Sequence, residues 1–196
     1  MARSPRDGRA ALLVGVSGTD ASGKGYITKE LAELLARRQK KVAVIGADGW
    51  LNLPAVRFDP ADPAWTFYTR GFRFEDMFRQ LVLPLCERGS IDLKAELAEE
   101  TAGAFHTHRY SFEDVQIVLV EGIFVYKKDY AKLFDLRIWI ECSTETALKR
   151  AVARSQEGLP PAQTIRAYET IYFPAQRIHA ERDDPRGAAD LIMVNE

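Results

Sequence analysis

The sequence predicts an α/β protein with a parallel sheet of five strands, covered by helices on both faces. Short apolar runs alternate with segments whose apolar residues recur at helical spacing, which is the pattern of parallel strands joined by helical crossovers. A glycine-rich turn also joins the first apolar run directly to the first helical segment. The apolar runs cover residues 10–14, 42–46, 116–122, 136–141 and 189–194.

Length and composition narrow the class of protein. The 196 residues suit one compact domain, which we expect over 10–196, after a polar and basic tail over 1–9. A net charge of −1 gives no basic excess, which argues against nucleic-acid or membrane-surface binding. The only cysteines, Cys86 and Cys142, lie in apolar or helical contexts and suggest no disulfide framework, so we expect a cytoplasmic protein. No apolar run is long enough to span a bilayer.

The glycine-rich turn has the spacing of a phosphate-binding loop, Gly18-x4-Gly23-Lys24. Its glycines let successive backbone N–H groups converge on an anion, and the helix N-terminus adds the positive end of its dipole. Lys24 would place its ammonium against the β- and γ-phosphates of a nucleotide. An ordinary glycine-rich turn is the alternative, and the flanking strand and helix argue against it. We expect the nucleotide to contact Gly18, Thr19, Asp20, Ala21, Ser22, Gly23, Lys24, Gly25 and Tyr26.

The loop departs from its motif at Gly25. The motif has Ser or Thr after the lysine, and that hydroxyl normally binds magnesium. Two carboxylates stand at the ends of later strands, Asp48 after the second and Glu121 after the third. In open α/β sheets this edge faces the ligand crevice. The alternatives are a turn aspartate at Asp48 and a salt bridge from Glu121 to Lys24.

The remaining elements follow from the same signals. Residues 52–65, rich in Pro and Asp, predict a loop, and 74–88 predict a helix with a kink at Pro84. The alternating segments 91–97 and 104–112 predict edge strands or a hairpin, although 95–100 could also form a short helix. Further helices are expected over 144–156, with Ser143 as N-cap and Gly158 after its end, and over 162–182, interrupted near Pro174.

Two pairs of basic or titratable residues share a face. Arg150 and Arg154 lie four apart on a helix, where they could neutralise charge on a phosphoryl group; exposed surface arginines are the alternative. His106 and His108 lie two apart, on one face of a strand. Zinc binding would need a third ligand, and both cysteines are remote in sequence.

Together these segments resemble the uridine kinase branch of the phosphoribulokinase/uridine kinase family of P-loop kinases, from about Leu12 to Val194. The resemblance implies a P-loop NTPase fold of the nucleoside-kinase type. It also implies ATP- and Mg²⁺-dependent phosphorylation of a primary hydroxyl of a small molecule. It rests on four segments in order: Gly15–Gly18 with Ser22–Lys24, Phe105–Arg109, Val120–Phe124 and Lys149–Arg154.

The resemblance also implies residue roles. Asp48 would be the catalytic base, acting with Lys24, Arg150 and Arg154, while Glu121 and Asp48 would hold magnesium through water. A lid is implied around 150–160 and a substrate hairpin around 91–112. Here the chain departs from the family at Gly49-Trp50 and Ser155, and 96–103 is an insertion. The implied acceptor contacts are His106, His108, Arg109 and Tyr110, with Asp59 and Asp62 competing for the ribose-binding aspartate.

The expected acceptor is uridine or cytidine, converted to its 5′-monophosphate. Pantothenate, a sugar or another riboside is the alternative within the family. A nucleotide-binding regulator without activity is the alternative from another class, for which Gly25 argues. A GTPase is disfavoured because no Asn-Lys-x-Asp segment is present. The sequence leaves the oligomeric state open.

Overall fold

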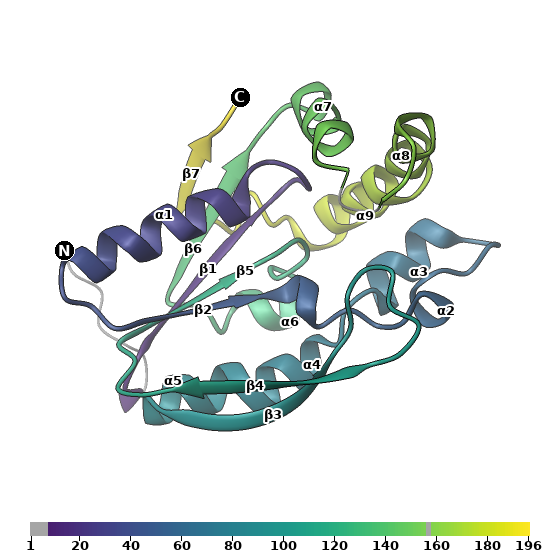
Figure 1. Ribbon diagram of the computed structural model, residues 1–196. Coiled ribbons are helices and arrows are strands. Elements are labelled where there is room, and N and C mark those ends of the chain that lie inside the picture. The colour runs from purple at the N-terminus through teal and green to yellow at the C-terminus, as the bar shows by residue number, and fades with distance from the viewer. Residues whose placement is uncertain (1–7, 156–157) are drawn as a thin grey trace.

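A parallel five-stranded sheet forms the centre of the computed structural model, which describes residues 8–155 and 158–196 (Figure 1). Its strand order is β2-β5-β1-β6-β7, and each neighbouring pair is parallel, as the sequence predicts. Most of the expected tail, residues 1–7, lies outside the described residues. The strands are β1 (Leu12–Gly18), β2 (Val42–Gly46), β5 (Ile117–Glu121), β6 (Leu136–Glu141) and β7 (Leu191–Val194).

The strand register aligns the carboxyl ends of three strands. Val16 of β1 and Gly46 of β2 both pair with Glu121 of β5, so these strands end side by side. The loop after β1, the turn after β2 and the last residue of β5 therefore meet at one edge of the sheet. This edge is where ligands bind in open parallel sheets.

Both faces of the sheet are covered by helices, as predicted. Val14 and Val16 of β1 belong to an apolar cluster that packs against α1 (Lys24–Arg37), whereas Leu13 belongs to the larger core on the opposite face. This alternation follows from the two-residue period of a strand. Figure 1 shows α1 on one side of the sheet. The larger core also contains residues of α3 (Pro63–Arg70), α4 (Phe74–Met77), α5 (Leu83–Arg88), α7 (Thr144–Arg154) and α9 (Phe173–Asp183).

A kink was predicted at Pro84 and an interruption near Pro174. In the structure each proline follows a π-helical turn, and the helix continues through it. Between α4 and α5 the helix widens over Phe78–Val82, just before Pro84. Between α8 (Pro161–Ala167) and α9 it widens over Tyr168–Tyr172, just before Pro174. Proline has no N–H and its ring crowds the carbonyl four residues back, and a wider turn relieves both problems. The side chain of Ser143 caps α7 as predicted, accepting from the Thr146 N–H at 3.2 Å.

The loop predicted over 52–65 is wrong. The segment forms α2 (Pro54–Arg57) and the start of α3. Pro63 occupies the first turn of α3, and the Asp62 side chain accepts from the Trp65 N–H at 3.1 Å. Proline and aspartate therefore act here as helix-start residues, which is their usual role at an N-terminus.

Residues 91–112 form an antiparallel hairpin of β3 (Ile91–Leu97) and β4 (His106–Phe112), in which Leu97 pairs with His106. A helix over 95–100 is therefore excluded. The connection 98–105 is held near the end of β2 because the Ala98 N–H donates to the Gly49 carbonyl at 3.2 Å. The short helix α6 (Lys128–Ala131) completes the fold. No helix within the described residues has the length and apolarity needed to cross a membrane.

Candidate active site

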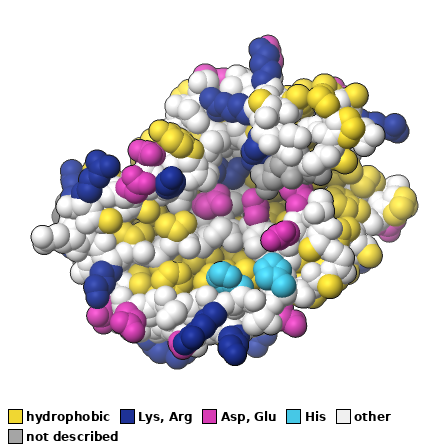
Figure 2. Space-filling model, viewed as in Figure 1, with side chains coloured by type: hydrophobic (Ala, Val, Ile, Leu, Met, Phe, Trp, Pro, Cys, Tyr) yellow, Lys and Arg dark blue, Asp and Glu magenta, His cyan; other side chains and the backbone are white. Residues whose placement is uncertain are grey.

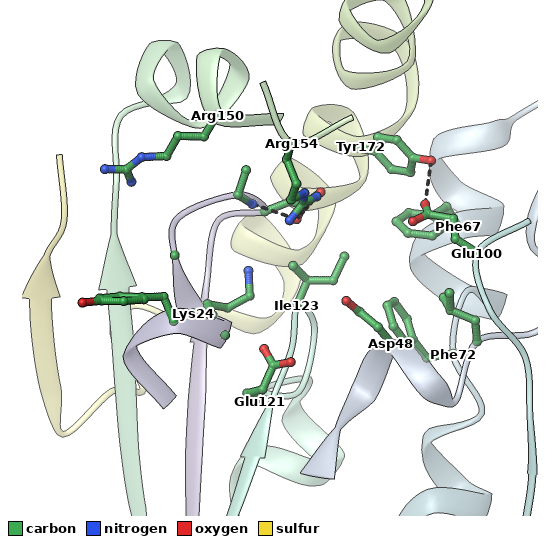
Figure 3. Close-up of a pocket in the computed structure, with 16 residues that line it drawn as sticks. Lys24, Asp48, Phe67, Phe72, Glu100, Glu121, Ile123, Arg150, Arg154 and Tyr172 are labelled. Carbon is green, nitrogen blue, oxygen red and sulfur yellow. Dashed lines mark hydrogen bonds and ion pairs between the residues drawn. The ribbon is translucent and has the colours of Figure 1, made fainter. Parts of the chain in front are cut away.

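A cavity of about 460 Å³ opens at the carboxyl edge of the sheet. In Figure 2, acidic side chains gather in a hollow in the middle of the face shown. One part of the cavity, called here the Lys24 end, is lined by Asp20, Ala21, Gly23, Lys24, Gly25, Tyr26, Glu121, Arg150 and Arg154. The other, the Asp48 end, is lined by Asp48, Leu51, Phe67, Phe72, Glu100, Ile123 and Tyr172 (Figure 3).

Backbone geometry explains why two positions of the loop, 18 and 23, are occupied by glycine. Gly23 adopts a left-handed conformation with φ of +91°, and a Cβ there would lie 2.4 Å from Asn195 Nδ2. A Cβ on Gly18 would lie 2.3 Å from the Ile140 carbonyl oxygen. Lys24 begins α1 and is 7% exposed, and its ammonium donates to the Thr19 carbonyl at 2.9 Å. The predicted loop, strand and helix are thus arranged as a phosphate site requires.

Gly25 lines the cavity in the first turn of α1. A Cβ placed on it would meet no atom within 4 Å. The absence of a Ser or Thr hydroxyl at this position is therefore not a consequence of crowding.

Asp48 and Glu121 reach the cavity from neighbouring strands. Asp48 sits on a one-turn 3₁₀ helix, Ala47–Gly49, directly after β2. Its side chain is open to the cavity but has protein on most sides; this burial, followed by the charge of Asp20, raises its pKa, whereas Lys24 opposes the shift. Burial, and then the charge of Asp48, raise the pKa of Glu121 to about 7. For both carboxylates, burial and the neighbouring negative charge therefore outweigh the opposing charge of Lys24.

This donor set fits magnesium, which prefers oxygen ligands and keeps several of its waters. A divalent cation near Asp48 and Glu121 would offset both the burial and the charge of Asp48 that raise the Glu121 pKa. Among the described residues, no group of three or more His, Cys, Asp or Glu side chains could hold a metal ion on its own. Water and phosphate oxygens would have to supply the remaining ligands.

Arg150 and Arg154, which were predicted to belong to a lid, line the cavity but point apart in Figure 3. Arg154 Nη2 lies 3.7 Å from Asp20 Oδ1. Asp20 is also anchored by α9 and the π turn before it, because Gln176 Oε1 accepts from its N–H at 2.9 Å and the Tyr168 hydroxyl donates to its Oδ2 at 2.6 Å. Arg150 instead donates to the Asn195 carbonyl at 2.9 Å. Part of the predicted lid, residues 156–157, lies outside the described residues.

The structure brings only part of the predicted acceptor set near Asp48. His106 lines a neighbouring cavity of about 330 Å³, together with Asp48 and Glu100. His108, Arg109 and Tyr110 line neither cavity. Arg109 instead donates to Asp92 through its Nε at 2.7 Å, and Tyr110 stacks on Trp50 with 6.3 Å between ring centroids.

Asp59 and Asp62 also lie away from the cavity lining. Asp62 caps α3, and Asp59 Oδ1 accepts from the Ala61 N–H at 2.9 Å. Both carboxylates thus stabilise local turns. The structure does not support the sugar-binding role that the resemblance implied for one of them.

Four side chains of the Asp48 end were missed by the sequence analysis. Phe67 lies on α3, Phe72 follows it, Glu100 lies in the hairpin connection and Tyr172 ends the second π turn. The Tyr172 hydroxyl donates to Glu100 Oε1 at 3.3 Å (Figure 3). Phe67 and Phe72 belong to an aromatic-rich segment whose helix was read as a loop at its start. No local pattern marks Glu100 or Tyr172.

Comparisons with known proteins place this site in context. No protein-family model matches the chain. The chain is 26% identical to uridine-cytidine kinase 2-B of Danio rerio, over 95% of this chain and 77% of the relative. It is 25% identical to the uridine kinase of Mycoplasma pneumoniae, over 95% of this chain and 86% of the relative. The predicted resemblance to uridine kinases is thus confirmed over nearly the whole chain.

Solved structures confirm the predicted fold. A possible uridine kinase from Bacillus stearothermophilus superposes with a TM-score of 0.74 at 20% identity, covering 93% of this chain and 88% of that one. A putative fructose transport system kinase from Silicibacter sp. TM1040 also gives 0.74, at 18% identity, covering 97% and 93%. The fold is that of the P-loop kinases, and together with the curated relatives it supports the assignment of this chain as a kinase.

Proposed function

We propose that this protein transfers the γ-phosphoryl group of ATP to the primary hydroxyl of a nucleoside, uridine or cytidine. The observation that carries the proposal is the cavity itself, which has a glycine-rich loop and Lys24 at one end and a strand-end carboxylate at the other. The similarity to uridine kinases over nearly the whole chain supports the nucleoside as acceptor.

Asp48 is the proposed base. In the transfer, the acceptor oxygen forms a bond to the γ-phosphorus, the bond to the β-phosphate oxygen breaks, and the hydroxyl proton passes to Asp48. A raised pKa makes this carboxylate a stronger proton acceptor than an ordinary aspartate. Lys24 and Arg154 line the side of the cavity where the phosphates would bind, and their charges would stabilise the transferring group.

Asp48 and Glu121 would hold magnesium through its waters. When bound, the ion supplies positive charge that offsets the negative charge of the phosphates. Gly25 contributes no hydroxyl, so this chain would depend on its carboxylates more than a loop with Ser or Thr does. Removal of divalent cations with EDTA should abolish turnover, and added MgCl₂ should restore it.

A neutral sugar or another riboside is the second candidate acceptor. The observation that favours it is the position of His108, Arg109 and Tyr110, which lie off the cavity in this structure. The expected nucleoside contacts are thus not formed here.

A cytoplasmic location stays a prediction; Cys86 and Cys142 are both free thiols.

An acceptor panel tests the proposal. ADP release would be followed with uridine, cytidine, adenosine, ribose, fructose and pantothenate, each in the presence of Mg²⁺ and ATP. Uridine or cytidine should give the highest kcat/KM. If a sugar or pantothenate is phosphorylated and none of the nucleosides is, the proposal of a nucleoside acceptor is wrong. No turnover with any acceptor would favour the regulator.

A further inference from the structure

We infer that the acceptor is an uncharged molecule and that Glu100 binds those of its hydroxyl groups that do not react. This inference rests on the proposed function, because it assumes that the acceptor occupies the Asp48 end. It assigns a role to a residue that lies in the connection between β3 and β4.

The distribution of charge around the cavity argues for a neutral acceptor. All basic side chains among the described lining residues, Lys24, Arg150 and Arg154, belong to the Lys24 end. The Lys24 end also carries two carboxylates, Asp20 and Glu121, whereas the Asp48 end carries Asp48 and Glu100 without any basic lining residue. A carboxylate or phosphate on the acceptor would add a third negative charge there, and like charges brought together in a partly buried site weaken binding strongly.

Arg57 does not line the cavity, but it contacts Glu100, which does. It is 1% exposed, and its Nη2 donates to the Glu100 carbonyl oxygen. Burial lowers its pKa, whereas the nearby charges of Glu100, Tyr172 and Asp48 act to raise it. The guanidinium therefore holds the connection 98–105 through the Glu100 carbonyl and offsets part of the charge of Glu100.

Glu100 is placed to accept hydroxyl donors. The Tyr172 hydroxyl already donates to its Oε1 at 3.3 Å, which orients the carboxylate. An ionised carboxylate offers roughly four acceptor positions, so it can take hydroxyl groups of a ligand in addition to tyrosine. Bonds from hydroxyl groups to an ionised oxygen are stronger than bonds between neutral groups.

The apolar residues of the Asp48 end would contact the part of the acceptor that carries no hydroxyl groups. Phe67, Phe72, Leu51 and Ile123 are each at most 8% exposed and line the same end of the cavity. In Figure 3, Glu100 and Tyr172 lie on the same side of the cavity as Asp48 and Phe72. An acceptor whose reacting hydroxyl meets Asp48 would thus present its other hydroxyls to Glu100 and a flat or apolar part to the phenylalanines. A riboside meets both requirements, whereas pantothenate has a second hydroxyl and an apolar part but also a carboxylate, whose charge this end would disfavour.

The test compares uridine with 2′,3′-dideoxyuridine in four proteins: the wild type, Glu100→Ala, Glu100→Gln and the control Glu96→Gln. Glu96 is exposed and lines neither cavity. Turnover would be measured by ADP release, and binding by calorimetry with a non-hydrolysable ATP analogue present. The wild type and the control should prefer uridine by about tenfold or more, because the partly buried Glu100 carboxylate would lose its hydroxyl partner when the dideoxy compound binds. Glu100→Ala should lose this preference, and Glu100→Gln should keep part of it.

Pantothenate provides the charge test in the same binding assay. It should bind the wild type at least about tenfold more weakly than uridine, and Glu100→Ala should narrow this gap. Pantothenate binding more tightly than uridine, a full uridine preference in Glu100→Ala, or no binding of any neutral acceptor would each overturn the inference.

The two proposals can fail separately. Uridine turnover that Glu100→Ala leaves unchanged, with its preference intact, would overturn the role of Glu100 and leave the kinase standing. Uridine binding whose hydroxyl preference depends on Glu100, without any turnover, would support the inference and overturn the proposed reaction.

Discussion

The two ends of the cavity are built in different ways. The Lys24 end comes mainly from one continuous stretch, Gly18–Tyr26, in which backbone N–H groups and a lysine follow a fixed spacing. The Asp48 end is assembled from five separate places in the chain: 48–51, 67–72, 100, 123 and 172. A site for phosphate can thus be encoded locally, whereas the site for the other substrate depends on how distant segments pack.

The two ends also differ in charge. The three basic lining residues all belong to the Lys24 end, beside Asp20 and Glu121, whereas the Asp48 end has two carboxylates and aromatic walls but no basic lining residue. This division matches the division of labour in a kinase, in which one substrate is highly charged and the other need not be. The predictions below test whether the two ends act separately, beginning with the largest expected effect.

Lys24→Ala should reduce kcat by about a thousandfold, because the ammonium is a major positive charge at the transferring phosphoryl group. The fold should persist, which circular dichroism and thermal unfolding would check. Lys29→Ala, on the exposed side of the same helix, is the matched control and should turn over normally. Wild-type turnover in Lys24→Ala with any acceptor would contradict the phosphate-loop assignment.

Asp48→Asn should reduce kcat by roughly a hundredfold or more while leaving ATP affinity nearly unchanged, since the change removes a base at the opposite end from the phosphates. The amide keeps the shape of the turn, so the midpoint of thermal unfolding should shift little. Asp129→Asn, at an exposed position on α6, serves as control. An unstable Asp48→Asn protein whose folded molecules turn over normally would show that Asp48 is structural.

Gly25→Ser should lower the magnesium concentration needed for half-maximal rate, by about three- to tenfold, because it adds a direct oxygen ligand. The structure has room for the side chain, as no atom lies within 4 Å of the new Cβ. Acceptor KM should not change if the two ends act separately. No effect of Gly25→Ser, together with an inactive wild type, would favour the regulator over the kinase.

The smallest expected effect concerns a polar cluster that joins α3, at the Asp48 end, to α9. Asp183 Oδ2 accepts from the Tyr68 hydroxyl at 2.6 Å and from His179 Nδ1 at 2.7 Å. Burial lowers the pKa of His179, although Asp183 opposes the shift. Burial would raise the pKa of Asp183, but the hydrogen bonds from Tyr68 and His179 outweigh it and the net shift is downward.

The lowered pKa of His179 determines the direction in which the free energy of unfolding changes with pH. Below about pH 6.5 the unfolded chain binds a proton at His179 that the folded protein resists, so the free energy of unfolding should fall as the pH drops. The slope from this group cannot exceed about 1.4 kcal/mol per pH unit. Urea unfolding between pH 5 and 7 would measure it. The slope should shrink in His179→Gln and persist in His108→Gln; equal slopes in all three proteins would contradict the prediction.

The comparison also shows what could be predicted from sequence. The loop, its strand and its helix were predictable because their signals lie within a few residues of one another. Asp48 and Glu121 were predictable because strand ends in a parallel sheet share an edge. The start of α3 was predicted as a loop, because Asp62 and Pro63 favour both turns and helix starts.

Glu100 and Tyr172 could not be predicted, because 72 residues separate them and their contact depends on the path of the hairpin connection. That path is set by long-range bonds, from Ala98 to Gly49 and from Arg57 to Glu100. The same long-range packing turns Arg109 toward Asp92 and away from the cavity. Motif spacing carries no information about either outcome.

The most direct test of the account is to identify the product. The wild-type protein would be incubated with Mg²⁺, ATP and uridine, and the reaction followed by ³¹P nuclear magnetic resonance. We expect the signal of the γ-phosphate to be replaced by that of a monophosphate ester on the 5′-oxygen of uridine, at a rate that Asp48→Asn lowers by roughly a hundredfold. Appearance of inorganic phosphate alone, or of no new signal, would contradict an acceptor bound at the Asp48 end and phosphorylated from the Lys24 end.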